Sequence, residues 1–144
     1  MPRRSVLALD LEGTLISNAV SQIPRPGLFT FLEGCQELFP RIVMFTTVSE
    51  LRFRAIAGVL IQEGAAPAWF AELEYVPWTG ATKDLALIRD AAVEECLLVD
   101  DFEAYVHPGQ LAQWICIDSF AHPYEASDTE LVKVLEKLQI RLSP

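Results

Sequence analysis

Residues 5–15 read SVLALDLEGTL, a short apolar run that ends in a carboxylate, Asp10. A second acid, Glu12, follows two positions later, and Gly13 supplies a residue without Cβ for the turn beyond the run. A buried strand that carries Asp10 at its carboxyl end places a charge where open α/β sheets bind their ligands. Two carboxylates so close repel each other unless a cation or a proton lies between them. The stretch therefore predicts a metal-assisted site at the end of the first strand.

The length of 144 residues is the usual size of one domain, and with 51% hydrophobic and 22% charged residues the chain can fill one core, so we expect a single domain over residues 1–144. The net charge of −9 argues against a nucleic-acid partner and against an anionic membrane, and the oligomeric state stays open. The apolar run before Asp10 is too short for a signal peptide or a membrane span, so we expect a cytoplasmic protein. The three cysteines form no Cys-x-x-Cys pair, which fits reduced thiols.

Apolar runs of strand length alternate with helical patterns along the chain, which is typical of a parallel α/β sheet. We expect strands at residues 5–10, 41–46, 73–76, 96–101 and 114–118. We expect helices at residues 28–39 and 47–62, a helix that starts near Thr82, and a terminal helix after residue 127. Capping boxes headed by Thr47 and Ser127 mark two of these helix starts. The pattern predicts an α/β fold with a Rossmann-like, doubly wound parallel sheet.

Polar side chains follow several of the predicted strands at the point where each strand ends. They are Asp10, Thr46, the pair Asp100 and Asp101, and Asp118. All carboxyl ends of a parallel sheet lie at one edge, so the residues that follow the first, second and fourth strands can converge. A single acid at a strand end carries little weight, because Asp and Thr also cap helices. Acids from two strands and a hydroxyl from a third predict a shared site.

The motif at residues 10–15, DLEGTL, resembles the Asp-x-Asp-Gly-Thr signature of the haloacid dehalogenase superfamily of phosphotransferases. Thr46 after Phe45 resembles the second motif, Lys83 the third-motif lysine, and Asp100 with Asp101 the fourth-motif acidic pair. The order and the spacing also fit. The resemblance implies the superfamily's α/β core and a phosphatase that depends on Mg²⁺.

Within the superfamily, the chain resembles the small phosphatases that act on the RNA polymerase C-terminal domain, the NLI-interacting-factor-like branch. The similar segments are RPGL at 25–28, VMFT at 43–46, KDL at 83–85 and AYVHP at 104–108. Most of the superfamily covers its site with an inserted cap. The stretches 14–46 and 46–83 are too short to hold a cap domain, so we expect an open site. An open site suits a bulky substrate such as a phosphoprotein.

The resemblance also implies a role for each motif residue. Asp10 would attack phosphorus and become an aspartyl phosphate, and Glu12 would serve as general acid and base. The expected catalytic residues are Asp10, Glu12, Thr46 and Lys83. The expected substrate-binding residues are Gly13, Thr14, Thr46, Thr47 and Lys83. The expected metal site holds Mg²⁺ through Asp10, the backbone carbonyl of Glu12 and Asp101, with Asp100 acting through water or as an orienting group. Mn²⁺ fits the same oxygen ligands.

Glu12 is a departure, because most of the superfamily has Asp at this position. The added methylene extends the carboxyl by roughly 1.5 Å. The change leaves a second interpretation open, a catalytically reduced binding protein that keeps the fold. A third interpretation is a receiver-like phosphoacceptor module, which also uses an Asp cluster, a Thr and a Lys. The motif order disfavours it, because receivers place the acidic pair before the phosphorylated Asp.

Overall fold

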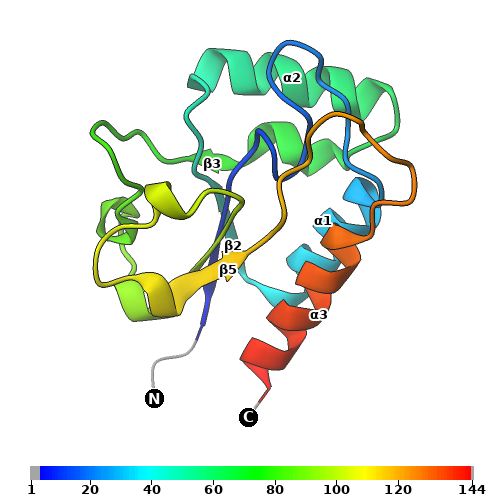
Figure 1. Cartoon of the computed structure of the whole chain (residues 1–144). Helices are drawn as coiled ribbons and strands as arrows, with labels where there is room; N and C mark the ends of the chain where they lie inside the picture. The colour runs from blue at the N-terminus through cyan, green and yellow to red at the C-terminus, as the bar shows by residue number, and fades with distance from the viewer. Residues whose placement is uncertain (1–3, 144) are drawn as a thin grey trace.

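Five parallel strands form one sheet in the order β3-β2-β1-β4-β5 in the computed structural model, which describes residues 4–143 (Figure 1). The strands are β1 (Val6–Leu9), β2 (Arg41–Met44), β3 (Glu74–Tyr75), β4 (Cys96–Asp100) and β5 (Trp114–Cys116). Each of the five predicted strands is present, and each is shorter than expected by one or two residues. The predicted parallel α/β sheet is confirmed, and β1, which carries the first motif, is its central strand.

The register of the central strands brings the predicted site residues to one edge. Leu9 pairs with Met44 of β2 on one side and with Val99 of β4 on the other. The backbone N–H of Asp10 donates to the carbonyl oxygen of Val99 at 3.0 Å. Asp10 and Asp100 therefore follow adjacent positions of neighbouring parallel strands, at the edge where such sheets bind ligands.

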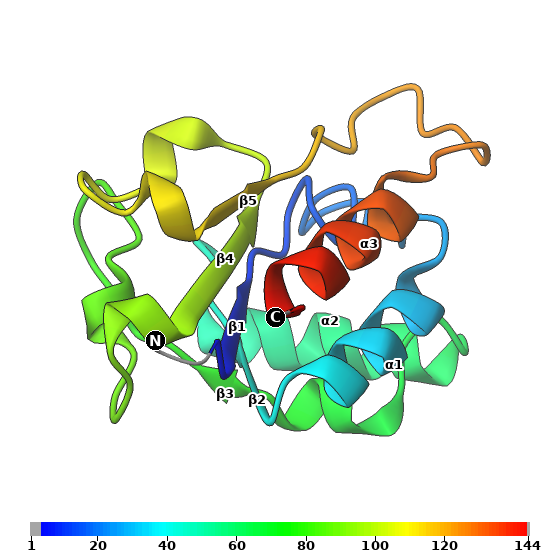
Figure 2. The ribbon, with the colours of Figure 1, turned by 90° about the horizontal axis from the view of Figure 1, so that it is seen from below.

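Three helices cover one face of the sheet: α1 (Leu28–Leu38), α2 (Glu50–Gln62) and α3 (Glu130–Leu142) (Figure 2). Alternate strand residues point to opposite faces, and Leu7, Leu9 and Val99 share a buried cluster with the apolar sides of these helices. None of the helices within residues 4–143 is long and apolar enough to cross a bilayer.

The opposite face of the sheet is covered by irregular chain rather than by a helix. Short 3₁₀ turns, η2 (Leu85–Leu87) and η3 (Val93–Glu95), connect β3 to β4. The helix expected from Thr82 was therefore wrong. The Asp84 carboxylate accepts from Ala86 N and from Gln110 Nε2, and Gln110 Oε1 accepts from Leu85 N. These side-chain bonds to the backbone take the place of a helical ladder.

The two predicted capping boxes are each displaced by a residue or two. Ser49, not Thr47, caps α2, since its hydroxyl accepts from Arg52 N at 3.3 Å. At the start of α3 the carboxylate of Asp128, not the hydroxyl of Ser127, accepts from Glu130 N at 3.0 Å. The expected end of α2 at Gln62 is confirmed.

Candidate active site

The ammonium group of Lys83 lies between two carboxylates from adjacent strands. Its Nζ is 2.9 Å from Asp10 Oδ1 and 2.6 Å from Asp100 Oδ2. The lysine is wholly buried, at 0% exposure. Its backbone N–H donates to Tyr105 O, which joins the loop after β3 to the loop after β4. Lys83 therefore reaches the site from an irregular segment, not from the start of the helix expected near Thr82.

Thr14 connects Asp10, which follows β1, to the acidic pair. Its hydroxyl donates to Asp10 Oδ2 at 2.7 Å and lies 3.4 Å from Asp101 Oδ1. The turn that leads from Asp10 to Thr14 requires a glycine, because Gly13 has a φ of +76°, which strains residues that carry a side chain. A Cβ at Gly13 would lie 2.4 Å from Asp101 Oδ2, so a side chain at this position would displace that carboxylate. The Gly-Thr part of the motif thus packs directly against the acids.

Asp10, Asp100 and Asp101 each offer a carboxylate oxygen within 4.8 Å of the others, and the first two are buried. Burial raises the pKa of Asp10 to about 8, against the opposing attraction of Lys83. Burial likewise raises the pKa of Asp100. The three carboxyl groups outnumber the single ammonium group of Lys83, so the cluster has more acidic than basic groups. Hard oxygen donors with an excess negative charge fit a divalent cation such as Mg²⁺.

Glu12 lies at the side of the site, not in the acidic cluster. Its Oε2 accepts from the backbone N–H of Ala19 at 2.7 Å, which ties the half-buried side chain to the loop before α1. The role of its backbone carbonyl as a metal ligand stays a prediction.

Thr46 is buried at the carboxyl end of β2, where the sequence placed it. Its hydroxyl accepts from Val48 N at 3.1 Å, and its carbonyl accepts from the indole Nε1 of Trp78 at 2.7 Å. Thr47, expected to contact substrate, is exposed and directly follows. Trp78 is half-buried, so it packs at the rim rather than in the interior. These contacts orient the Thr46 backbone toward the same edge as Asp10.

Two polar side chains at the site were not expected from the sequence. Arg25 is buried, with 1% exposure, and donates to the carbonyls of Gly13 and Thr14, each at 3.2 Å. The hydroxyl of Ser119 donates to Asp101 Oδ2 at 2.7 Å. Arg25 is part of the RPGL segment, but its hydrogen-bond partners lie far from it in the sequence, so the sequence alone does not indicate them. Asp118, predicted as a strand-end acid, instead contributes its backbone carbonyl to Arg25 Nη2 at 2.7 Å.

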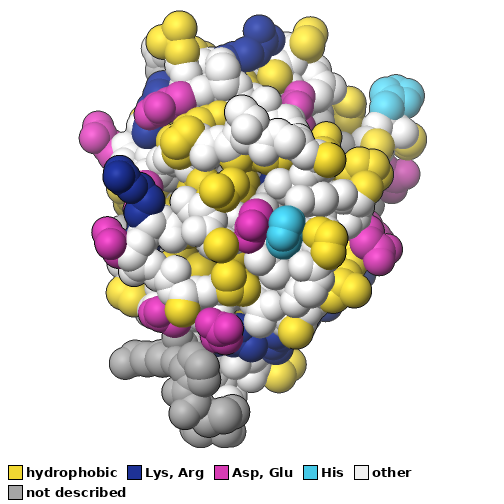
Figure 3. All heavy atoms as spheres, turned by 90° about the vertical axis from the view of Figure 1, so that its left-hand side faces the viewer, with side chains coloured by type: hydrophobic (Ala, Val, Ile, Leu, Met, Phe, Trp, Pro, Cys, Tyr) yellow, Lys and Arg dark blue, Asp and Glu magenta, His cyan; other side chains and the backbone are white. Residues whose placement is uncertain are grey.

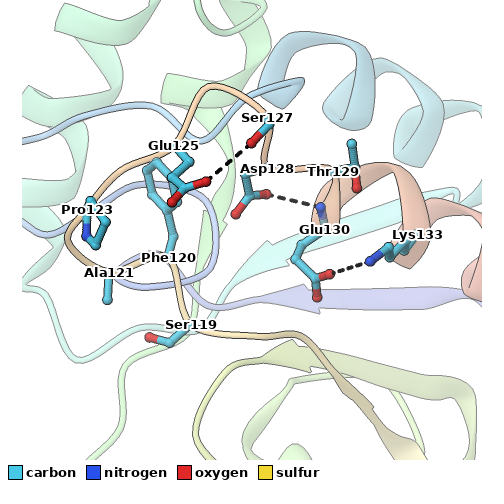
Figure 4. Close-up of a pocket in the computed structure, with 10 residues that line it drawn as sticks. All are labelled: Ser119, Phe120, Ala121, Pro123, Glu125, Ser127, Asp128, Thr129, Glu130 and Lys133. Atoms are coloured by element: carbon cyan, nitrogen blue, oxygen red, sulfur yellow. Dashed lines mark hydrogen bonds and ion pairs between the residues drawn. The ribbon is translucent and has the colours of Figure 1, made fainter.

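A pocket of about 380 Å³ lies beside the site, between residues 119–129 and the start of α3 (Figure 4). Its polar groups are paired with one another: Ser127 donates to Glu125, and Lys133 forms an ion pair with Glu130. Ser119 at its edge contacts Asp101, but neither Asp10 nor any residue of β1 lines the pocket. The acidic cluster and Lys83 therefore lie outside this pocket.

A family model described as NLI interacting factor-like phosphatase matches residues 5–143. The search of curated proteins returned no match. The matched span includes all the motif residues that the fold brings together at the carboxyl edge of the sheet. The family model covers almost the whole chain. The chain belongs to the family of NLI interacting factor-like phosphatases.

Proposed function

We propose that this phosphatase hydrolyses phosphate monoesters with Mg²⁺, through an aspartyl phosphate on Asp10. The observation that carries the proposal is the buried Lys83 ammonium, which lies within 3 Å of both Asp10 and Asp100. A lysine so placed orients the nucleophile and neutralises the incoming phosphoryl group. Phosphoryl transfer depends mainly on positioning and electrostatic stabilisation, and the site supplies both.

Asp10 is held at both carboxylate oxygens, by Lys83 at Oδ1 and by Thr14 at Oδ2. In the first step an oxygen of Asp10 forms a bond to phosphorus while the bond from phosphorus to the ester oxygen breaks. Glu12 gives a proton to the departing oxygen. In the second step water attacks the phosphorus of the aspartyl phosphate and loses a proton to Glu12. The bond to Asp10 breaks, and inorganic phosphate leaves.

Residues of the acidic cluster would hold the metal. Asp10, Asp101 and the backbone carbonyl of Glu12 are the proposed ligands, and Asp100 would act through water or orient Lys83. When bound, Mg²⁺ supplies positive charge to the phosphoryl oxygens. Thr46 and Thr47 would bind the remaining phosphate oxygens.

We propose that residues 1–144 act as one cytoplasmic domain whose site has no inserted cap. In the described part of the chain, the segments between the motifs form α1, β2, α2, β3 and short turns. The proposed substrate is accordingly bulky, with a phosphoprotein as the leading class. The net charge of −9 disfavours a nucleic-acid backbone as substrate.

The experiment is hydrolysis of p-nitrophenyl phosphate by the wild type, Asp10→Asn and Asp118→Asn, with and without Mg²⁺. We expect turnover that needs Mg²⁺ and disappears in Asp10→Asn. Asp118→Asn is the matched control, because its exposed carboxyl lies at the same edge while only its backbone contacts Arg25. Full activity in Asp10→Asn, or turnover that ignores Mg²⁺ and chelator alike, would contradict the proposed mechanism.

A further inference from the structure

Three aromatic side chains lie in series beside the acidic cluster. The ring centroids of Phe102 and Tyr105 are 4.9 Å apart at an interplanar angle of 82°. Those of Tyr105 and Trp78 are 6.2 Å apart at 78°. Trp78 in turn packs edge to face on the buried ring of Phe45, 5.8 Å away. Edge-to-face pairs at these separations are attractive, so the series forms a braced wall that runs from the core to the surface.

Each residue of the wall contacts a different residue of the site, Trp78 and Tyr105 through their rings and Phe102 through its backbone. The Trp78 indole donates to the Thr46 carbonyl at 2.7 Å. The Lys83 ammonium lies 5.0 Å from the centre of the Tyr105 ring. The remaining member, Phe102, donates its backbone N–H to Asp100 Oδ1 at 2.9 Å. The wall therefore stands next to the position where the phosphoryl group must be bound.

The outer member of the wall is open to solvent. Phe102 is 51% exposed, and Tyr105 and Trp78 are half-buried. Figure 3 shows apolar side chains at the surface of one face of the molecule, among polar and charged ones. A large aromatic ring that stays half exposed gains little for the core, and apolar surface beside a polar site is typical of a ligand-binding wall.

We propose that Trp78, Tyr105 and Phe102 bind the ring of an aromatic leaving group, so that the substrate is an aryl phosphate monoester, with phosphotyrosine as its protein-borne form. The inference rests on the proposed function, because it needs the phosphoryl group to lie at Asp10 and Lys83. The ester oxygen then leads away from the acids along the wall. An aromatic ring extends the edge-to-face series by one member, which an alkyl chain such as that of phosphoserine cannot do.

The test measures the binding of phenylphosphonate and of methylphosphonate in the presence of Mg²⁺, by calorimetry. Both carry the same charged group and neither can be hydrolysed. We expect phenylphosphonate to bind about tenfold more tightly. In Phe102→Ala the ratio of the two affinities should fall severalfold toward one. Leu111→Ala is the matched control, since Leu111 is also an exposed apolar residue but lies in η5 (Leu111–Gln113), before β5.

Each outcome separates the subsite from the reaction. Equal affinity of the two phosphonates in the wild type would overturn the aromatic subsite and leave the phosphatase mechanism standing. Failure of both to bind would overturn the mechanism and the subsite together. An unchanged ratio of the two affinities in Phe102→Ala would overturn the proposed role of Phe102 in binding the ring. Competition of a phosphotyrosyl peptide with phenylphosphonate would identify a protein as the source of the ring. Competition by free tyrosine phosphate alone would identify a small aryl ester, and both results support the subsite.

Discussion

Arg25 and Asp128 form a two-point ion pair, with Nε 3.0 Å from Oδ1 and Nη2 3.1 Å from Oδ2. The same guanidinium donates to the carbonyls of Gly13 and Thr14 in the turn that follows Asp10. Its plane also lies over the ring of Phe120, 5.3 Å from the centre. The pair thus joins the start of α3 to the turn that orients Asp10. A planar fork can satisfy all these acceptors at once, which an ammonium cannot.

Arg25→Gln should lower the free energy of unfolding by about 3 kcal/mol, because it leaves buried acceptors and Asp128 without their cation. Arg25→Lys should recover only part of the loss, since it keeps the charge but not the fork. Urea denaturation measures both. Arg41→Gln is the control, because its pair with Glu74 is solvent-exposed and should contribute about 1 kcal/mol or less. A loss in Arg25→Gln no larger than that of the control would show that the clamp adds nothing.

Acid should weaken the fold through Asp128. Burial raises the pKa of Asp128, but the hydrogen bond from Arg25 and the positive charge of Arg25 lower that pKa. The net shift of the Asp128 pKa is downward. A carboxylate whose pKa is lower in the folded state than in the unfolded state stabilises the fold. This stabilisation is complete above the unfolded-state pKa of about 4 and is lost as the pH falls through the folded-state pKa. The wild type should therefore exceed Asp128→Asn in stability at neutral pH, and the gap should close below pH about 4. Unfolding curves from pH 7 to 3 measure it, with exposed Glu63→Gln expected to follow the wild type.

Gly13→Ala should separate backbone strain from damage to the site. Gly13 and Gly27 both have positive φ, +76° and +82°, so alanine at either should cost about 1 kcal/mol of stability. A Cβ at Gly27 meets nothing within 4 Å, whereas one at Gly13 lies 2.4 Å from Asp101 Oδ2. We expect Gly27→Ala to keep full turnover and Gly13→Ala to lose most of it, with weaker Mg²⁺ binding. Equal activity in the two variants would mean that Asp101 can move without consequence.

Glu12→Gln should slow turnover by roughly a hundredfold or more, the usual contribution of a general acid and base. Its Mg²⁺ affinity should stay near that of the wild type, because the Glu12 carboxylate binds Ala19 N rather than the acidic cluster. Steady-state kinetics and Mg²⁺ titration by calorimetry give the two values. Glu12→Asp is the matched variant, which keeps the acid but shortens its reach. A large loss of Mg²⁺ affinity with unchanged turnover would assign Glu12 to the metal instead.

The sequence was most informative where one residue pattern has one physical cause. The central strands could be predicted, because VLAL at 6–9 and CLLVD at 96–100 are buried on both faces and read as apolar runs. The edge position of Asp10, Thr46 and Asp100 followed from parallel topology alone. The contacts of Asp10 and Asp100 with Lys83 needed the family resemblance, because nothing local to Lys83 indicates where its side chain lies.

The segment between β3 and β4 could not be predicted, because its backbone is organised by distant side chains. Asp84 and Gln110 hold the turn at Leu85, and the two are far apart in the sequence. Arg25 was missed for the same reason, since a buried arginine is recognisable only once Asp128 is placed against it. The bond of Glu12 to Ala19 could not be predicted either, because it depends on the path of the loop before α1.

The central position of β1 has a consequence for how the chain reaches its native state. β1 pairs with β2 early in the sequence and with β4 only after most of the chain has followed. Pairings between such distant segments must close a long loop before they gain any contact, which makes folding slow. Until β4 docks, Asp10 has neither Asp100 nor the Lys83 that bridges them. Catalytic competence should therefore appear late and all at once in a refolding time course, in step with burial of β4.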